Sequence, residues 1–273
     1  MQREIAQFER ISRLSRKTSF SKAIALDEQL VETVRQVKSN EVLANPALQN
    51  VYLSLVDYLC DFASQWFDRP IQQLRILDWG CGKGHITFLL RRHQAQVISA
   101  DRSDNSEDSA FGQETPLIQQ FDIQVIGLEH DYLLPFEDES FDIVLSFGVL
   151  EHVPNDKASL QEIHRILKSN GLFYCFFLPY TFSWTQRLQH MLGNYYHDRL
   201  YGKRQVRKML SHNGLQLIDI WHRQLLPKNS VNYVNYRLAE RVDQWLTSYT
   251  WLKFLATNIE FVAAKSSVQE RLG

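Results

Sequence analysis

Residues 76–87 read ILDWGCGKGHIT, and this stretch decides the fold of the chain. Its apolar start is typical of the end of a buried parallel strand, and residues 85–91 read as the start of a helix. Between them lie three glycines in the spacing G-x-G-x-G, Gly80, Gly82 and Gly84. Glycine has no Cβ and tolerates positive φ, so such a loop lets the backbone approach a bound molecule closely. The helix N-terminus adds free N–H groups and partial positive charge, and the unit therefore predicts a nucleotide or nucleoside site.

Two details of this loop argue against a dinucleotide. The pyrophosphate-binding pattern is G-x-G-x-x-G, in which the third glycine allows close packing of helix against strand. His85 occupies that position here. Asp78, two residues before the first glycine, would repel a diphosphate. A carboxylate at this point suits a ligand with positive charge, such as an ammonium group beside a sulfonium.

With Asp78 in this place, the loop resembles motif I of the class I S-adenosylmethionine (SAM)-dependent methyltransferases. The resemblance extends over roughly residues 74–179 and implies SAM as the cofactor, with S-adenosylhomocysteine as the product. It implies that the whole loop contributes to the cofactor site, namely Asp78, Trp79, Gly80, Cys81, Gly82 and Gly84. Two interpretations of Trp79 stay open, a cation–π contact with the sulfonium or packing under the loop. Cys81 reads as a small buried filler rather than a nucleophile.

A second acid follows the next expected strand. Residues 96–100 predict a strand that ends at Asp101, roughly 20 residues after Asp78, the separation expected of an acid that reaches ribose hydroxyls. One carboxylate holds a vicinal diol well because it accepts two hydrogen bonds. The resemblance implies four further cofactor contacts, at Arg102, at Asp131 near the adenine amine, at Tyr132 and at Phe147.

The flanking pattern is that of an α/β protein. Strands are expected at residues 141–147, 172–178, 215–221 and 258–264, and helices at residues 48–66, 160–167, 203–212 and 238–246. Asn170-Gly171 reads as a helix stop. The resemblance implies a Rossmann-like, doubly wound sheet of seven strands in the order 3-2-1-4-5-7-6, with strand 7 antiparallel. We expect three parts: a helical extension or cap over residues 1–69, the SAM-binding core over residues 70–178, and a lid segment that completes the same domain over residues 179–273.

Methyl transfer needs few catalytic groups, because the sulfonium already activates the methyl group. Rate then comes from positioning and from exclusion of water, and only a protonated acceptor needs a base. Histidine suits that role near neutral pH. His152, in the loop after the strand at residues 141–147, is the first candidate, and His197 is the second. The alternative is that these histidines only make local hydrogen bonds. Glu151 is a candidate for binding an acceptor hydroxyl or amine.

The segment after the 172–178 strand, PYTFSWTQRLQHMLGNYYHDRLYG, has many aromatic residues. One interpretation is a lid in which Tyr195, Tyr196, His197 and Tyr201 face the acceptor. The other is that these aromatics pack over the sheet. A related question concerns the basic N-terminal residues (Arg10, Arg13, Arg16 and Lys17) together with the aromatic residues of the tail. Such a surface can rest on a membrane, while the alternative is helices that cover the sheet and each other.

Composition narrows the class of protein. The 273 residues include 44% apolar and 22% charged residues, as in an ordinary globular protein, and the net charge of −1 argues against a nucleic-acid partner. No apolar run reaches about 20 residues, so no spanning helix is expected, and the N-terminus lacks a secretory apolar core. Three widely spaced cysteines form neither a metal site nor a disulfide framework, which favours the cytoplasm.

These observations predict a SAM-dependent methyltransferase that acts on an oxygen or nitrogen of a small-molecule acceptor: a metabolite, a quinone, a sugar or a lipid-linked molecule. No metal ion is expected. A non-catalytic SAM-binding module that regulates a partner is one alternative, and an NAD-dependent oxidoreductase is another. The oligomeric state and the acceptor stay open.

Overall fold

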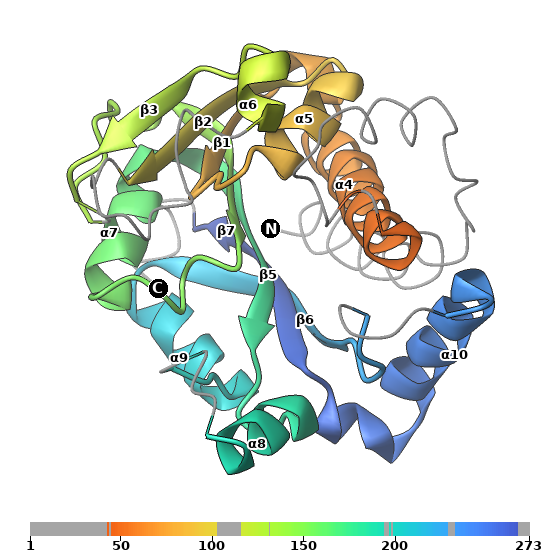
Figure 1. Cartoon of the computed structure of the whole chain (residues 1–273). Helices are drawn as coiled ribbons and strands as arrows, with labels where there is room; N and C mark the ends of the chain where they lie inside the picture. Colours follow the sequence, from red (N-terminus) through yellow and green to blue (C-terminus); the bar gives the residue numbers. More distant parts are fainter. Residues whose placement is uncertain are drawn as a thin grey trace.

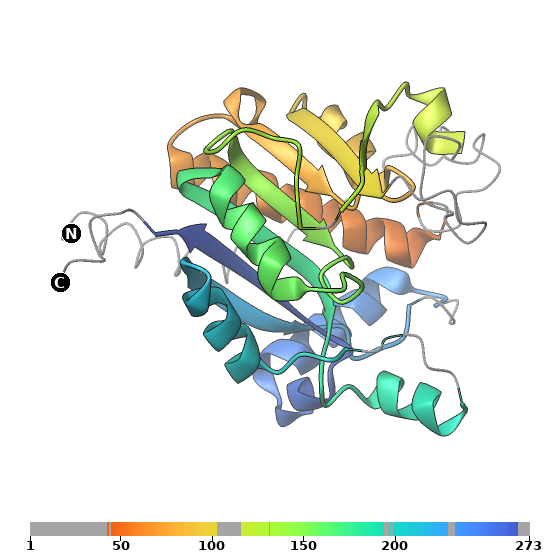
Figure 2. The ribbon, with the colours of Figure 1, turned by 90° about the vertical axis from the view of Figure 1, so that its left-hand side faces the viewer.

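A computed structural model describes residues 43, 45–102, 116–130, 132–193, 197, 199–228 and 233–266. Its centre is one sheet with helices on both faces (Figures 1 and 2). The strands are β1 (Arg75–Trp79), β2 (Gln96–Arg102), β3 (Val125–Leu128), β4 (Phe141–Phe147), β5 (Leu167–Pro179), β6 (Leu215–Arg223) and β7 (Asn258–Lys265). The helices are α4 (Pro46–Phe67), η1 (Ile71–Gln73), α5 (His85–Arg92), α6 (Pro116–Gln120), α7 (Asp156–Ile166), α8 (Trp184–Met191), α9 (Lys203–His212), α10 (Tyr236–Tyr249) and η2 (Trp251–Leu255).

The strand order is β3-β2-β1-β4-β5-β7-β6, and β7 runs antiparallel to both of its neighbours. The predicted fold class and topology are therefore confirmed. Parallel pairing of β1 with β2 and β4 brings the carboxyl ends of these three strands to one edge of the sheet. In such sheets, ligands bind beyond the carboxyl ends of the strands, where the strand order reverses.

The two faces of the sheet carry separate hydrophobic clusters. Alternation along β1 sends Ile76 to the face covered by α4 and α5, and Leu77 to the face covered by α7 and α9. The inner strands are apolar along almost their whole length because helices cover both faces of the sheet.

The helix α4 packs in the same cluster as β1 and α5. Its start is fixed by Asn45, whose side chain accepts hydrogen bonds from the backbone of Ala47 (2.9 Å) and Leu48 (3.3 Å), and by proline at position 46. The division of the chain into a cap, a core and a lid stays a prediction. The basic residues Arg10, Arg13, Arg16 and Lys17 lie outside the described residues.

The boundary between α7 and β5 differs from the prediction. The helix ends at Ile166, and β5 begins at once with Leu167, which pairs with Phe141. Asn170 has a φ of +62°, and the register between β4 and β5 shifts before Leu172. The Asn-Gly pair therefore bends a strand, and the prediction that it stops a helix was wrong.

Candidate active site

The glycine loop is held against its surroundings at two points where no side chain fits. Gly80 has a φ of +71°, and a Cβ there would lie 2.5 Å from a methyl carbon of Val149. Gly84 has a φ of +78°, and a Cβ there would lie 2.9 Å from Ile118. Both values are below any normal carbon–carbon contact. The loop therefore lies directly against the loop after β4 and against α6.

Asp101, at the end of β2, is bound to this loop. Its Oδ2 accepts a hydrogen bond of 2.5 Å from the backbone N–H of Gly82, and its Oδ1 accepts one of 2.7 Å from the backbone N–H of Arg102. Each carboxylate oxygen has a second lone pair. The half-buried group thus has the capacity to accept hydrogen bonds from a ligand while it fixes the loop.

Asp78 lies behind the loop. It is 1% exposed, and its Oδ2 accepts a hydrogen bond of 2.6 Å from the hydroxyl of Thr87 on α5. The Thr87 hydroxyl also lies 2.7 Å from that of Ser99 on β2. Burial, together with the nearby charge of Asp101, raises the pKa of Asp78 to about 6. The structure thus shows Asp78 joining β1, α5 and β2, a role that sequence reasoning did not anticipate.

The other two loop side chains are buried as well. Trp79 is 1% exposed and packs in the cluster beneath α7, so its ring offers no open face and the packing interpretation holds. The cation–π interpretation finds no support in this structure. Cys81 is buried, and desolvation raises the pKa of its thiol, as expected of a filler rather than a nucleophile.

Aromatic rings line the neighbouring part of this edge. Phe147, the last residue of β4, lies 6.4 Å from Tyr52 of α4 between ring centroids. Tyr52 also contacts His85 edge-on at 6.0 Å, and burial lowers the pKa of His85 to about 4. Sequence reasoning did not single out Tyr52 as a site residue, because the apolar spacing of this helix predicted only that Tyr52 packs in the core.

The adenine side of the predicted site is described in part. Tyr132 is 44% exposed and stacks on His130 at 5.2 Å. Arg102 is exposed at the end of β2. Asp131 lies outside the described residues. The structure therefore places Tyr132 and Arg102 at the rim of the same strand ends as Asp101.

One carboxylate and two imidazoles meet just after β4. The ligand atoms of Glu151, His152 and His197 all lie within 4.8 Å of one another. The rings of His152 and His197 are 5.3 Å apart, and His152 Nε2 lies 3.9 Å from Glu151 Oε1. The side chain of Glu151 is 2% exposed, whereas that of His152 is 54% exposed. Burial raises the pKa of Glu151 to about 7. Such a set is able to share a proton, and its donor types also suit a divalent cation.

Tyr201 packs inside the protein, in agreement with the second interpretation of this aromatic segment. It is 1% exposed, and its hydroxyl lies 3.3 Å from the carbonyl of Leu150 and 3.2 Å from the carboxylate of Asp156. Its ring packs beneath the loop that carries Glu151. The two oxygens near its hydroxyl supply the hydrogen-bond partners that a buried phenol needs. Tyr195 and Tyr196 lie outside the described residues.

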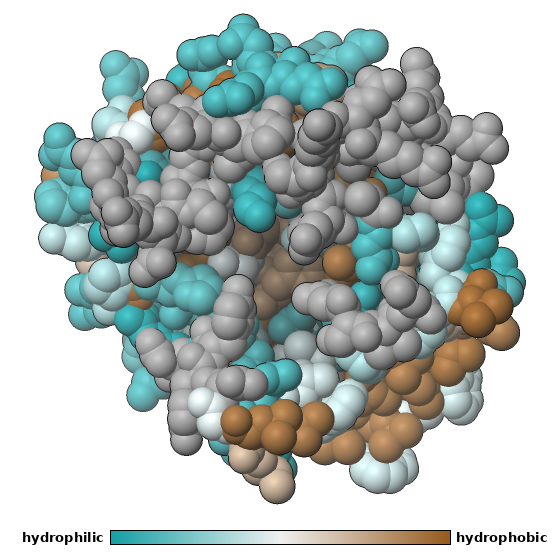
Figure 3. All heavy atoms as spheres, viewed as in Figure 1, coloured by the Kyte–Doolittle hydropathy of each residue, from teal (hydrophilic) through white to brown (hydrophobic). Residues whose placement is uncertain are grey.

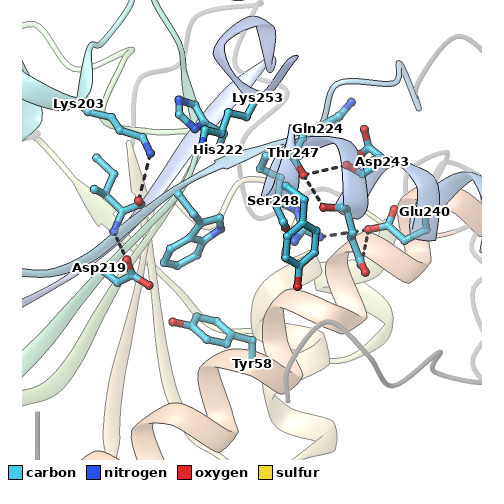
Figure 4. Close-up of a pocket in the computed structure, with 15 residues that line it drawn as sticks. Tyr58, Lys203, Asp219, His222, Gln224, Glu240, Asp243, Thr247, Ser248 and Lys253 are labelled. Carbon is cyan, nitrogen blue, oxygen red and sulfur yellow. Dashed lines mark hydrogen bonds and ion pairs between the residues drawn. The ribbon is translucent and has the colours of Figure 1, made fainter. Parts of the chain in front are cut away.

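A separate cavity of about 400 Å³ lies between β6, α10 and α4 (Figure 4). It is lined by polar and aromatic side chains, among them Tyr58, Trp221 and Lys253. None of the residues predicted to bind the cofactor lines it. This cavity is therefore distinct from the strand ends described above.

Comparison with known proteins gives the geometry its context. Residues 77–175 match the family model described as a methyltransferase domain. The ubiquinone biosynthesis O-methyltransferase of Maricaulis maris is 33% identical over 126 residues, which is 44% of this chain and 46% of that protein. The corresponding enzyme of Rhizobium rhizogenes is 26% identical and matches over 59% of this chain and 70% of its own length. The chain spans about half the length of most of the curated relatives that it matches.

Solved structures share the fold. A SAM-dependent methyltransferase from Thermotoga maritima superposes with a TM-score of 0.55 at 16% identity, over 88% of this chain and 97% of its own. The YcgJ protein of Bacillus subtilis gives 0.50 at 18% identity, over 79% of this chain and 98% of its own. At these identities the likeness concerns the architecture alone.

Proposed function

We propose that the chain, whose residues 77–175 match a methyltransferase domain, is a class I enzyme that uses S-adenosylmethionine to methylate a small-molecule acceptor. The observation that carries the proposal is the position of the Glu151–His152–His197 set directly after β4, beside the glycine loop. A proton acceptor in this place suits transfer to an oxygen that is protonated before the reaction.

The residues of the loop fit the cofactor. SAM, when bound, supplies a methyl group that its sulfonium already activates. We assign the ribose diol to Asp101, whose carboxylate is held at the strand end by Gly82 and Arg102. The positive φ values of Gly80 and Gly84, and their close contacts with Val149 and Ile118, explain why the loop needs glycine at these two positions. The negative charges of Asp78 and Asp101 favour a ligand with an ammonium and a sulfonium group.

Within the set after β4, we assign proton acceptance to His152, because its imidazole is the most exposed of the three groups. Glu151 lies behind it, and His197 lies beside it. In this arrangement His152 takes the proton of the acceptor hydroxyl, and the two neighbouring groups orient its ring and stabilise its charged form. They are positioning residues in this proposal.

The relatives favour oxygen as the methylated atom. Those named above act in ubiquinone biosynthesis as O-methyltransferases, and ubiquinone is a ring with methoxy groups on a long apolar tail. We therefore propose a hydroxylated aromatic ring as the acceptor class. The three buried thiols, Cys60, Cys81 and Cys175, fit a reducing compartment, and we propose the cytoplasm.

The test begins with calorimetric titration of the whole chain with S-adenosylhomocysteine, with NAD as the control ligand. We expect binding of the first alone. Labelled SAM with a soluble catechol as probe acceptor then tests turnover. Binding of NAD alone would point to an oxidoreductase. Binding of S-adenosylhomocysteine without methylation of any hydroxylated aromatic in a broad panel would favour the non-catalytic module.

A further inference from the structure

The helix α10 buries its polar face and exposes its apolar face, the reverse of a normal surface helix. Its buried residues are all polar, Glu240, Asp243 and Thr247, and they follow the spacing of one helix face. Figure 4 shows this face turned toward the cavity beside β6. Polar partners satisfy it, since Lys228 pairs with both Glu240 and Asp243. Asp243 also accepts hydrogen bonds of 2.8 Å from two backbone N–H groups of the loop after β6.

The opposite face of α10 is apolar and exposed. Leu238, Val242, Trp245 and Tyr249 recur at helical spacing. Trp245 is 57% exposed and Tyr249 is 80% exposed. A surface helix normally turns such a stripe inward, and the burial of Glu240 and Asp243 beside Lys228 shows why this one does not.

The exposed stripe continues into η2 and toward α8. Trp251 and Phe254 of η2 are 72% and 52% exposed. A chain of ring contacts leads from Phe254 through His222 and Tyr180 to Phe182, just before α8. Figure 3 shows apolar surface over α8 and over α10 along the same rim of the molecule. We call the exposed apolar residues of α10 and η2 the docking face: Leu238, Val242, Trp245, Tyr249, Trp251 and Phe254.

The exposed charges of α8, α10 and η2 have one sign. The structure describes every residue of α8, α10 and η2, and the only acids in these elements are the buried Glu240 and Asp243. The basic residues there are Arg187, Arg237, Arg241 and Lys253, the first three exposed. The exposed charged residues of these three elements are thus all positive.

We propose that the docking face rests on an anionic lipid bilayer. Trp and Tyr prefer the interface between water and lipid, and an apolar stripe flanked by arginine is the pattern of helices that lie in this plane. Basic residues near an anionic lipid surface add electrostatic attraction. A second copy of the chain fits less well, because a twofold interface would bring the same arginines of both copies together. No helix among the described residues is long and apolar enough to span a bilayer.

The lipid contact also suggests where the enzyme meets its acceptor, and this suggestion rests on the proposed function. An acceptor with a long apolar tail resides in the bilayer, and an enzyme that rests on the lipid surface meets it there. The lipid contact itself follows from α10 and η2 and does not depend on the reaction.

The test is sedimentation of the full chain with lipid vesicles, neutral (phosphatidylcholine) or with about a third phosphatidylglycerol. We expect the natural protein to bind the anionic vesicles and Trp245→Glu to bind them at least tenfold more weakly. The double variant Arg237→Gln/Arg241→Gln should lose less affinity for the vesicles. High salt should weaken binding of the natural protein to a similar extent as this double variant. Ile126, exposed on β3 at the other edge of the sheet, provides the matched control Ile126→Glu, which should bind like the natural protein.

Two results would overturn the proposal. One is equal sedimentation of the natural protein and Trp245→Glu with anionic vesicles. The other is a stable dimer in light scattering that Trp245→Glu dissociates, without any binding of vesicles by the natural protein. Calorimetry with S-adenosylhomocysteine on the same variants shows that the fold is intact. Loss of vesicle binding with full cofactor binding separates this proposal from the proposed function.

Discussion

At the scale of single residues, Glu151 has the most direct thermodynamic consequence. Its pKa is about 7 in the folded protein, against 4.5 for an exposed glutamate. Between these two values the unfolded chain releases its proton while the folded chain keeps it. Stability therefore falls as the pH rises from about 4.5 to 7, by on the order of 3 kcal/mol.

The variant Glu151→Gln removes this pH-dependent contribution to the stability of the folded protein. We expect its melting temperature to fall less than that of the natural protein between pH 5 and pH 8, in scanning calorimetry. Asp78, with a pKa of about 6, contributes a fall of the same sign in both proteins and so does not affect the comparison. Parallel curves for the two proteins would show that Glu151 is not held neutral by burial.

Asp101 should determine cofactor affinity. Asp101→Ala removes the carboxylate that accepts the Gly82 N–H and that we assign to the ribose, so we expect affinity for S-adenosylhomocysteine to fall at least tenfold, about 1.4 kcal/mol. Asp61→Ala, an exposed acid on α4, is the control and should bind normally. Unchanged affinity in an intact Asp101→Ala protein would remove the assignment.

His152 should affect turnover and not cofactor affinity. A general base contributes typically 100-fold or more to rate, so His152→Ala should lower kcat by about this factor, measured with labelled SAM. Binding of S-adenosylhomocysteine should stay the same. His212→Ala, exposed at the end of α9, is the matched control. A chelator included in the assay should leave turnover unchanged if the set shares a proton rather than a cation.

Sequence reasoning at this scale depended on spacing. It predicted the glycine loop and the acid at the end of the second strand, because both are local patterns. It could not predict the hydrogen bonds that link Asp78 to Thr87 and Thr87 to Ser99, since they depend on strand register and helix placement. It left Tyr201 undecided between a lid and the core, because an aromatic residue gives the same signal in both.

At the scale of elements, one buried lysine pairs with both buried acids of α10. Lys228 is 3% exposed, and its Nζ lies 3.0 Å from Asp243 Oδ2 and also pairs with Glu240. Although burial favours the neutral acid, Lys228 and Arg223 lower the pKa of Glu240. Removal of a partner from a buried ion pair costs about 3–5 kcal/mol.

The variant Lys228→Met should therefore lose about that much stability in denaturant unfolding. Amide exchange should quicken in α10 before it quickens in α9. Addition of Glu240→Gln and Asp243→Asn should restore part of the loss, because no buried carboxylate is then left unpaired. Lys208→Met, exposed on α9, is the control. Equal exchange of α10 in Lys228→Met and in the control would contradict this account.

Periodicity predicted most elements but not the orientation of α10. The spacing of its apolar residues normally marks the side that packs inward. The structure reverses this because two acids on the other face meet a lysine from the preceding loop, a contact that helical periodicity does not encode. The prediction of the α7–β5 boundary was wrong for a related reason, because Asn-Gly marks a bend in the chain without specifying which element bends.

At the scale of the whole molecule, the strand order followed from the resemblance of residues 74–179 to a known family and not from the composition of the chain. The proposed cofactor site lies at the middle of the sheet, where the order reverses, and the docking face lies near the β6 edge (Figure 1). The residues proposed to bind the cofactor come from the ends of several strands, whereas those of the docking face come from one stretch, residues 238–254.

The position of β7 between β5 and β6 has a consequence for biosynthesis. As the chain leaves the ribosome, β6 has no neighbour in the sheet until residues 258–265 have been translated. Until then, the nascent protein exposes an unpaired edge of β5 to other polypeptides, a condition that favours aggregation. Chaperone demand during translation should therefore peak late, just before the final strand inserts.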